Sequence, residues 1–330
     1  MTSVRTQVCP PSPAFTEESL PLLSSRVYII TGATSGVGLE LAKMLYSKSA
    51  TVYIAARNAA RIASSIQAIK ELFPESAGRL ETMQIDLSDL QSIAPAAELF
   101  KRMESRLDGL VLNAAVMTPP DGSKSQQGHE LQMATNCLGG YTLLRHLEDA
   151  LVSTVSIAER ASVRVLWLAS TLQPGTPMIG IPKGGGIVWD ENKSEPAVRK
   201  NQMENYMMTK VGNAFLAHDT AMRLGTHGVI SVSINPGLIK TELQRHMPGP
   251  AAIVTGLVFK PAKFGAYSEL FALLSQDITP DNNGSFIIPW GRFGEFHSEI
   301  ESALKTREKG GTDVAKRFVD FCERETKVYQ

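Results

Sequence analysis

The stretch that decides the fold is Thr31-Gly-Ala-Thr-Ser-Gly-Val-Gly38, which directly follows the apolar run Val27–Ile30. Glycine adopts backbone conformations closed to other residues, so Gly32 and Gly36 permit a tight turn and a close backbone approach to a pyrophosphate. Gly38 lets the next helix pack on the strand, and the N-terminus of that helix then faces the phosphates. A strand, this turn and a helix are typical of a dinucleotide site, although a turn of this kind alone also fits a purely structural role.

Short β-rich apolar runs alternate with helical stretches along the chain, the pattern of a parallel sheet covered on both faces. The predicted strands are Val27–Ile30, Thr51–Ala55, Thr82–Gln84, Gly109–Leu112, Val163–Leu168, Val229–Ile234 and Ser285–Ile288. The predicted helices are Leu39–Lys48, Arg61–Leu72, Leu90–Glu104, Ala134–Ser153 and Met207–Leu224. We therefore expect a single doubly wound, Rossmann-type α/β domain with a seven-stranded, mainly parallel sheet and helices on both faces.

The first residues differ in composition from the rest of the chain. Residues 1–24 contain several prolines and the acidic pair Glu17-Glu18, and they lack the basic start and apolar core of a secretory signal. We expect a flexible N-terminal arm over 1–24 and a single domain over 25–330. No apolar run reaches the roughly 18–20 residues of a membrane helix, so we expect no transmembrane segment.

Charge and cysteine usage narrow the classes of partner. The chain has 33 basic and 33 acidic residues and a formal net charge of +0, which gives no electrostatic reason to bind nucleic acid. Cys9, Cys137 and Cys322 are widely spaced, and the six histidines form no HxxxH pattern, so we expect neither a disulfide framework nor a metal site. A reducing compartment, the cytoplasm, fits this pattern.

The residues after the second strand bear on the choice of nucleotide. Ala55-Ala56-Arg57-Asn58 lacks the acidic residue that usually receives the ribose hydroxyls of NAD. Arg57, helped by Ser35 or Arg61, can instead pair with the 2′-phosphate of NADP(H), because a guanidinium binds phosphate through two aligned donors. A solvated arginine that opens a helix is the alternative. We expect NADP(H) to be preferred over NAD(H).

Two polar residues follow the third and fourth strands. Asp86 can accept a hydrogen bond from an adenine amino group, or it can cap the helical stretch that starts at Ser88. Asn113 has a side-chain amide that can tie neighbouring strands together or touch the ribose. Both interpretations remain open for each residue.

The catalytic hypothesis starts from Tyr206 and Lys210, which lie four residues apart and therefore on one face of a helix. A free tyrosine has a pKa of about 10, and an adjacent ammonium stabilises the phenolate and lowers that pKa. Tyr206 can then exchange a proton with a substrate oxygen. Ser170 can donate a hydrogen bond to the same oxygen, with Thr171 as a near competitor. Asn136 can kink its helix or hold a water that connects the lysine to solvent.

From about Arg26 to Trp290 the chain resembles the short-chain dehydrogenase/reductase family, classical type, and within it the retinol-dehydrogenase-like branch. The matching positions are Thr31-Gly32, Gly36-Val37-Gly38, Asp86, Asn113-Ala-Ala115, Asn136, Ser170, Tyr206, Lys210 and Asn235-Pro-Gly-Leu-Ile-Lys-Thr241. The resemblance implies hydride transfer between nicotinamide C4 and a substrate carbon. Relatives are often dimers or tetramers, so a homo-oligomer is also expected.

The resemblance also implies roles for individual residues. The catalytic tetrad would be Asn136, Ser170, Tyr206 and Lys210. Within it, Tyr206 would be the acid/base, and Lys210 would also bond the nicotinamide ribose. Val37 would meet the pyrophosphate through its backbone, while Ile239 and Thr241 would contact the carboxamide and the phosphates.

The chain departs from the family pattern in two places. The common Asn-Asn-Ala-Gly is here Asn113-Ala114-Ala115-Val116, so strand anchoring and backbone room near the adenosine differ. The interval 171–205 is longer than in compact members and is predicted to be a substrate loop, with a solvent-exposed insertion as the alternative. A second predicted substrate loop covers 243–264. With Met207 and Met208 beside the tyrosine, we expect a bulky hydrophobic substrate, unless these residues are core.

The sequence therefore predicts an NADP(H)-dependent oxidoreductase acting on a hydrophobic ketone, aldehyde or alcohol, in secondary-metabolite biosynthesis. One alternative is a cofactor-bound isomerase, dehydratase or cyclase without net redox. A second is a non-enzymatic NADP(H) sensor, which is disfavoured because a sensor does not need Ser170, Tyr206 and Lys210 together.

Overall fold

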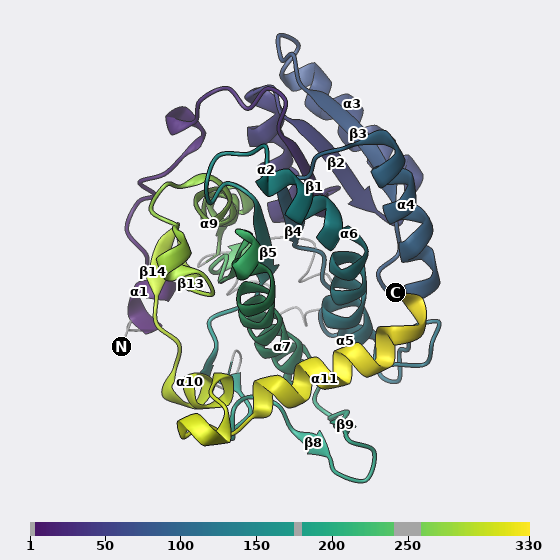
Figure 1. The fold of residues 1–330 in the computed structure, drawn as a ribbon, viewed down its shortest axis with the longest axis vertical. Helices are drawn as coiled ribbons and strands as arrows, with labels where there is room; N and C mark the ends of the chain where they lie inside the picture. Colours follow the sequence, from purple (N-terminus) through teal and green to yellow (C-terminus); the bar gives the residue numbers. More distant parts are fainter. Residues whose placement is uncertain (1–3, 175–179, 241–258) are drawn as a thin grey trace.

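A central eight-stranded sheet organises the molecule in the computed structural model, which describes residues 4–174, 180–240 and 259–330 (Figure 1). The strand order is β14-β13-β10-β5-β4-β1-β2-β3. The strands are β1 (Val27–Thr31), β2 (Thr51–Ala56), β3 (Arg79–Gln84), β4 (Gly109–Leu112), β5 (Arg164–Leu168), β10 (Ile230–Ile234), β13 (Phe286–Ile288) and β14 (Arg292–Gly294). This confirms the doubly wound α/β class.

The strand count differs from the expected seven. The additional strand, β14, pairs antiparallel with β13 at one edge of the sheet, whereas the other neighbouring strands are parallel. β14 is three residues long and returns through a turn at Gly291, so it lacks the apolar run that marks the inner strands. The sequence pattern could not distinguish it from a loop.

The strand order contains a switch point at β1. The chain passes from β1 to β2 and β3 on one side, then returns to place β4 on the other side of β1. In open α/β sheets, ligands bind in the crevice beyond the carboxyl ends of the strands at such a point. The glycine-rich turn directly follows β1 and lies at this crevice.

Helices cover both faces of the sheet, and each face has its own hydrophobic core. One face carries α2 (Gly36–Ser47), α3 (Ala59–Leu72) and α9 (Ala262–Leu274), and α2 packs on α9. The other carries α4 (Ile93–Met103), α6 (Gly139–Val155) and α7 (Gln202–Leu224). The C-terminal helix α11 (Val314–Thr326) crosses α7 and α6 (Figure 1).

Short elements complete the described chain. The remaining α-helices of the described ranges are α1 (Val4–Val8), α5 (Leu131–Met133) and α10 (Ser298–Leu304), and the π-helix η3 (Ala134–Leu138) lies between α5 and α6. The 3-10 helices are η1 (Glu17–Ser19), η2 (Leu90–Ser92), η4 (Gly225–His227), η6 (Pro280–Asn282), η7 (Arg307–Lys309) and η8 (Lys327–Tyr329). The two-residue strands are β6 (Gln173–Pro174), β7 (Gly180–Ile181), β8 (Trp189–Asp190), β9 (Glu195–Pro196), β11 (Ile239–Lys240) and β12 (Lys260–Pro261). No helix in the described ranges is both long and apolar enough to cross a membrane.

The described part of the N-terminal arm lies against the domain, where we expected a flexible segment. Leu23 is 1% exposed, and the ring of Phe15 meets that of Phe271 edge-on. Glu17 forms an ion pair of 2.6 Å with Lys263 on α9. Apolar and charged side chains scattered among the prolines therefore fasten the arm. The division of the chain at residue 25 stays a prediction.

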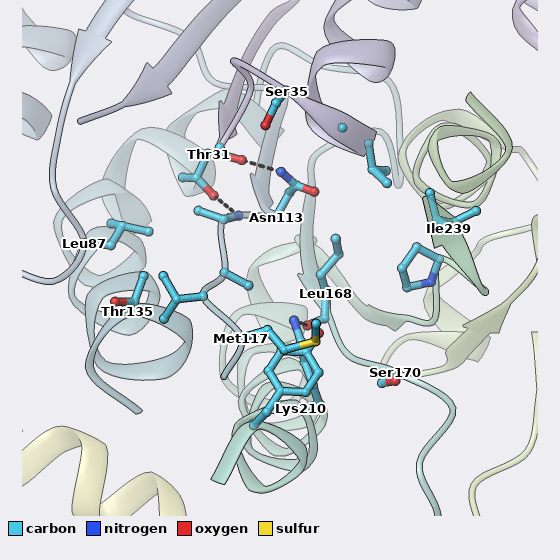
Figure 2. A pocket seen from close by; sticks show the side chains of 18 of the residues that line it. Thr31, Ser35, Leu87, Asn113, Met117, Thr135, Leu168, Ser170, Lys210 and Ile239 are labelled. Atoms are coloured by element: carbon cyan, nitrogen blue, oxygen red, sulfur yellow. Dashed lines mark hydrogen bonds between the residues drawn. The ribbon is translucent and has the colours of Figure 1, made fainter. Parts of the chain in front are cut away.

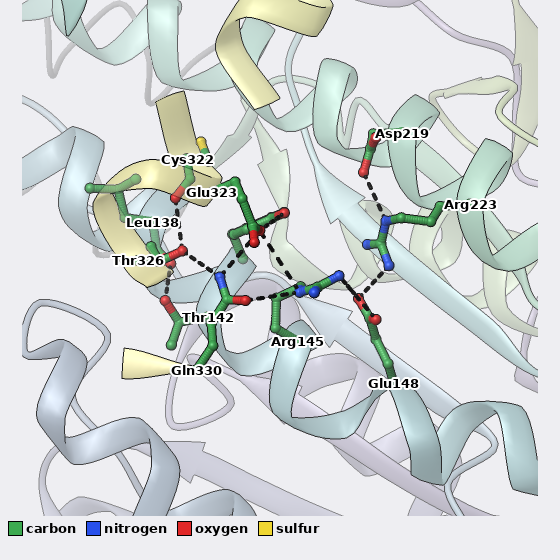
Figure 3. A network of polar contacts seen from close by, with 11 residues as sticks. Leu138, Thr142, Arg145, Glu148, Asp219, Arg223, Cys322, Glu323, Thr326 and Gln330 are labelled. Carbon is green, nitrogen blue, oxygen red and sulfur yellow. Dashed lines mark hydrogen bonds and ion pairs between the residues drawn. The ribbon is translucent and has the colours of Figure 1, made fainter. Parts of the chain in front are cut away.

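A polar network fastens the C-terminal helix to α6 and α7 (Figure 3). The Tyr141 hydroxyl of α6 donates to Glu323 of α11 at 2.7 Å. On the same side, Arg223 of α7 pairs with Glu148 of α6 at 2.7 Å. These contacts link α11 and α6 to α7, the helix that carries Tyr206 and Lys210.

Candidate active site

The glycine-rich turn is built around the side chain of Asn113, at the end of β4. Gly32 and Gly36 have φ values of +68° and +59°, which glycine adopts without strain. The Asn113 amide donates to the Thr31 carbonyl at 2.7 Å, and a Cβ at Gly38 would lie 2.6 Å from the same amide nitrogen (Figure 2). Asn113 therefore ties two strands together, one of its two predicted roles, and Gly38 leaves the room that it needs.

A cavity of about 370 Å³ lies at the carboxyl ends of the strands, a size within the usual range for small-molecule sites. The predicted site residues that line it are Gly32, Ser35, Gly36, Val37, Arg57, Asp86, Asn113, Ser170, Tyr206, Lys210 and Ile239. Gly38 and Asn136 lie behind the lining, and Thr241 falls outside the described residues. One cavity thus brings together most of the residues singled out from the sequence.

Tyr206 and Lys210 lie on α7 at the other end of this cavity. The Lys210 ammonium is 5.4 Å from the centre of the Tyr206 ring, and it donates to the Leu168 carbonyl at 2.9 Å (Figure 2). Both side chains are buried. The backbone carbonyl at the end of β5 therefore anchors the ammonium beside the phenol.

The pKa of Tyr206 moves opposite to the expected direction. We expected the lysine to lower it, but burial raises the pKa of the phenol above its ordinary value. Burial also lowers the pKa of Lys210 to about 8. Both shifts arise because desolvation disfavours the charged form of each group. The sequence could not reveal how deeply the two side chains are buried. At neutral pH the phenol holds its proton, which suits a proton donor.

Asn136 lies in the π-helical turn η3, one layer behind the cavity. Its carboxamide accepts from the Val116 backbone N–H at 2.8 Å and donates to the Thr209 hydroxyl at 2.9 Å. Thr209 in turn donates to the Tyr206 carbonyl at 2.7 Å. The structure therefore shows an irregular helix at Asn136 and a connection to the first turns of α7. A water-holding role for Asn136 stays a prediction.

Ser170 and Thr171 have different surroundings. Ser170 lines the cavity and, among the described residues, makes no hydrogen bond to Tyr206. Thr171 is buried, and its hydroxyl lies 3.5 Å from the side-chain nitrogen of Asn235, outside the cavity lining. This placement favours Ser170 over Thr171 as the donor to a substrate.

The opposite end of the cavity carries the candidate nucleotide residues. Arg57 follows β2 and lines the cavity with Ser35 and Arg61. Ser35 occupies the position before the first residue of α2, and its side chain does not cap that helix. The basic side chains and the start of α2 thus lie at one end, as an anionic group requires.

Asp86 also lines the cavity, and its carboxylate accepts from the Ser88 N–H at 2.9 Å and the Ser88 hydroxyl at 2.7 Å. The cap of the following 3-10 turn, η2 (Leu90–Ser92), is Asp89. Asp86 therefore supports the local turn rather than capping that helix. Contact with an adenine stays a prediction.

Sequence reasoning missed Asn213, which lies one turn beyond Lys210 on α7. Its amide donates to the Leu168 carbonyl at 2.8 Å, the same oxygen that receives the Lys210 ammonium. The available signal was a polar residue three positions after the lysine on a buried helix.

Parts of the two predicted substrate loops, residues 175–179 and 243–258, lie outside the described residues. Met207, which we expected beside a hydrophobic substrate, lines the cavity.

A doubly wound sheet with a glycine-rich turn at its switch point defines an α/β protein of the dinucleotide-binding class. The sequence model of the short chain dehydrogenase family matches residues 26–171. The chain is 37% identical to the short-chain dehydrogenase/reductase bet4 of Neocamarosporium betae, covering 100% of this chain and 94% of that protein. It is 40% identical to a short-chain dehydrogenase/reductase of Phomopsis amygdali, covering 98% and 96%.

A solved structure supports the same fold. The Pseudomonas aeruginosa RhlG/NADP active-site complex has a TM-score of 0.59 and 20% identity, over 82% of this chain and 96% of that one. The chain belongs to the short-chain dehydrogenase/reductase family, a family of oxidoreductases. The retinol-dehydrogenase-like branch stays a prediction.

Proposed function

We propose that this chain is an NADP(H)-dependent oxidoreductase that interconverts a hydrophobic ketone or aldehyde and the corresponding alcohol. The observation that carries the proposal is the Tyr206–Lys210 pair, buried at one end of a cavity whose other end is the glycine-rich turn. When bound, the nicotinamide cofactor supplies or accepts the hydride. The work left to the protein is orientation and proton transfer.

The residues at the reactive end match that work. In reduction, the neutral phenol of Tyr206 donates its proton to the carbonyl oxygen, and Ser170 donates a hydrogen bond to the same atom. The Lys210 ammonium, anchored on the Leu168 carbonyl, stabilises the phenolate that remains. In our account Asn136 is a positioning residue, which acts through Thr209.

The opposite end fits a nicotinamide dinucleotide. Cβ atoms at Gly32 and Gly38 would lie within 3.0 Å of the Asn113 amide nitrogen, so a larger residue at either position would displace the side chain that holds the turn. The start of α2 faces this end and attracts anions. We assign Arg57, with Ser35, to the 2′-phosphate of NADP(H) because both line the cavity after β1 and β2.

The substrate class follows from the apolar side chains near the tyrosine. Met117, Met203, Met207 and Phe259 line the cavity. Methionine adapts to irregular apolar shapes, so this lining suits a bulky hydrophobic molecule. We further propose a cytoplasmic enzyme of secondary-metabolite biosynthesis. The three cysteines are unpaired, which supports a reducing compartment.

The reaction is tested by incubating the purified protein with apolar ketones and aldehydes and NADPH deuterated at C4. We expect one alcohol formed per NADPH oxidised, with deuterium on the carbinol carbon. Tyr206→Phe removes the proton donor, so kcat should fall about 10²–10⁴-fold while NADPH binding persists.

Two outcomes would contradict this proposal. Product formation without NADPH oxidation would support an isomerase, dehydratase or cyclase. Unchanged turnover in Tyr206→Phe would remove the assigned proton donor. Tyr329→Phe is the matched control, because Tyr329 lies outside the cavity lining and its contact with His146 uses the backbone carbonyl, which the substitution keeps.

A further inference from the structure

The N-terminal arm reaches the active site from outside the sheet. Helix α1 lies beside β14 at the edge of the sheet (Figure 1). There the Arg292 guanidinium donates to the Thr6 carbonyl at 2.7 Å. The same guanidinium donates through Nε to the Pro289 carbonyl at 2.7 Å. Arg292 thus joins the arm to the segment between β13 and β14.

One side chain of the arm enters the interior. Gln7 is 1% exposed, and its side-chain oxygen accepts from the Asn235 side-chain nitrogen at 2.9 Å. Asn235, 2% exposed, follows β10 and lines the cavity. The same Asn235 nitrogen also lies 3.5 Å from the Thr171 hydroxyl, which is a longer contact. Gln7 is therefore the nearer acceptor for the Asn235 amide.

The Asn235 side chain also holds a backbone turn that forms part of the cavity wall. Its oxygen accepts from the Gly237 backbone N–H at 2.9 Å. Gly237 has φ +85°, and a Cβ there would lie 2.8 Å from the Trp290 ring, so the turn is tightly packed. Residues 235–239 all line the cavity. A rotation of the Asn235 amide would exchange its oxygen and nitrogen and break both hydrogen bonds.

We propose that Gln7 is a positioning residue of the active site, which orients Asn235 and thereby holds the Pro236–Gly237 turn in the cavity wall. Gln7 does not line the cavity, so it acts through Asn235 rather than by touching a ligand. The arm is then part of the site. The effect on cofactor affinity rests on the proposed function, whereas the effect on the turn does not.

The test compares Gln7→Met, which keeps the length of the side chain but removes the acceptor, with Gln7→Glu, which keeps an acceptor oxygen. Cys9→Ser, an exposed position on the same arm, is the matched control. The first readout is hydrogen exchange at the Gly237 amide in the protein without cofactor. The second is the Kd for NADPH from a fluorescence titration.

We expect exchange at Gly237 to become at least about tenfold faster in Gln7→Met, and the Kd for NADPH to rise about fivefold or more, because a buried amide loses its acceptor. Gln7→Glu should lie closer to the wild type, and Cys9→Ser should match it. Amides of α7 should keep their protection in every variant.

The inference is overturned if Gly237 exchanges in Gln7→Met as it does in the wild type. Equal loss of protection at Gly237 and in α7 would also overturn it, because the effect would then be general destabilisation. If the wild type binds no NADPH, the proposed function fails, and the exchange measurement still decides the role of Gln7.

Discussion

At the scale of single residues, burial sets the protonation of the candidate catalytic pair. Tyr206 and Lys210 share a buried face of α7, and desolvation raises the pKa of the phenol and lowers that of the ammonium. The two groups therefore begin as a protonated phenol beside a lysine that titrates within an accessible pH range. In this starting state the phenol holds the proton that a carbonyl oxygen would receive in the reductive half of the proposed reaction.

The lowered pKa of Lys210 predicts a pH dependence. The ammonium stabilises the phenolate only while it is protonated, and its pKa of about 8 places the loss of that proton just above neutral pH. We expect kcat/KM for carbonyl reduction to fall as the pH rises through about 8, measured between pH 6 and 10. In Lys210→Arg the residual activity should not fall across this window, because the guanidinium stays protonated. A wild-type profile that is flat to pH 10 would contradict the account.

At the scale of elements, the β1–α2 connection depends on the fit between Gly38 and the Asn113 side chain. The amide donates to Thr31 and occupies the space where a larger residue at position 38 would place its Cβ. The site thus depends on one glycine for room and on one asparagine for the link between β1 and β4.

Gly38→Ala tests this fit. The added Cβ would lie 2.6 Å from the Asn113 nitrogen and displace it, so we expect the Kd for NADPH to rise about tenfold or more, measured by titration. Gly140→Ala, also on a helix, is the control because its Cβ would meet its nearest neighbour at an ordinary 3.4 Å. Equal affinity of Gly38→Ala and the wild type would refute the spatial argument.

The elements also show what the sequence could predict. The inner strands appear as short apolar runs and were located within a few residues. Helix α9 was missed because it is buried over Gly265–Leu273 and so lacks a polar face with helical spacing. Helix α7 begins at Gln202 rather than Met207, since Asn201 caps it through the Met203 N–H.

The candidate site also combines local features, which the sequence displays, with long-range contacts, which it does not. The four-residue spacing of Tyr206 and Lys210 is local and could be recognised in the sequence. The contacts of Asn213 with Leu168 and of Gln7 with Asn235 join positions far apart in the chain. No local pattern marks such pairs, and burial, which reversed the expected pKa direction of the tyrosine, depends on the whole fold.

At the scale of the whole molecule, Glu269 on α9 is a buried ionisable group with no hydrogen bond, among the described residues, to offset the loss of its hydration. It is 0% exposed, and neither carboxylate oxygen has a hydrogen-bond partner. Burial raises the pKa of this carboxyl well above its ordinary value, so the folded protein holds a proton there that the unfolded chain releases. The contribution of Glu269 to the free energy of unfolding is complete below the ordinary pKa of a carboxyl group. It is lost as the pH rises from that value toward the higher pKa of the folded state.

Glu269→Gln should therefore stabilise the protein, and more at pH 8 than at pH 5. We expect a higher thermal midpoint at pH 8, by roughly 2–4 °C for each kcal/mol gained, from calorimetry. The exposed Glu308→Gln is the control and should leave the midpoint unchanged at both pH values. A midpoint difference that is the same at pH 5 and pH 8 would show that Glu269 does not titrate as described.

Binding of NADP(H) in the cavity is the central assignment for the whole molecule, and a titration of the purified protein with NADPH and NADH tests it most directly. We expect tighter binding of NADPH, and Arg57→Ala should weaken it about tenfold or more while leaving NADH unaffected. The exposed Arg160→Ala should change neither affinity. Equal affinity for both cofactors would contradict the assignment of Arg57, and binding of neither would contradict the proposed oxidoreductase function.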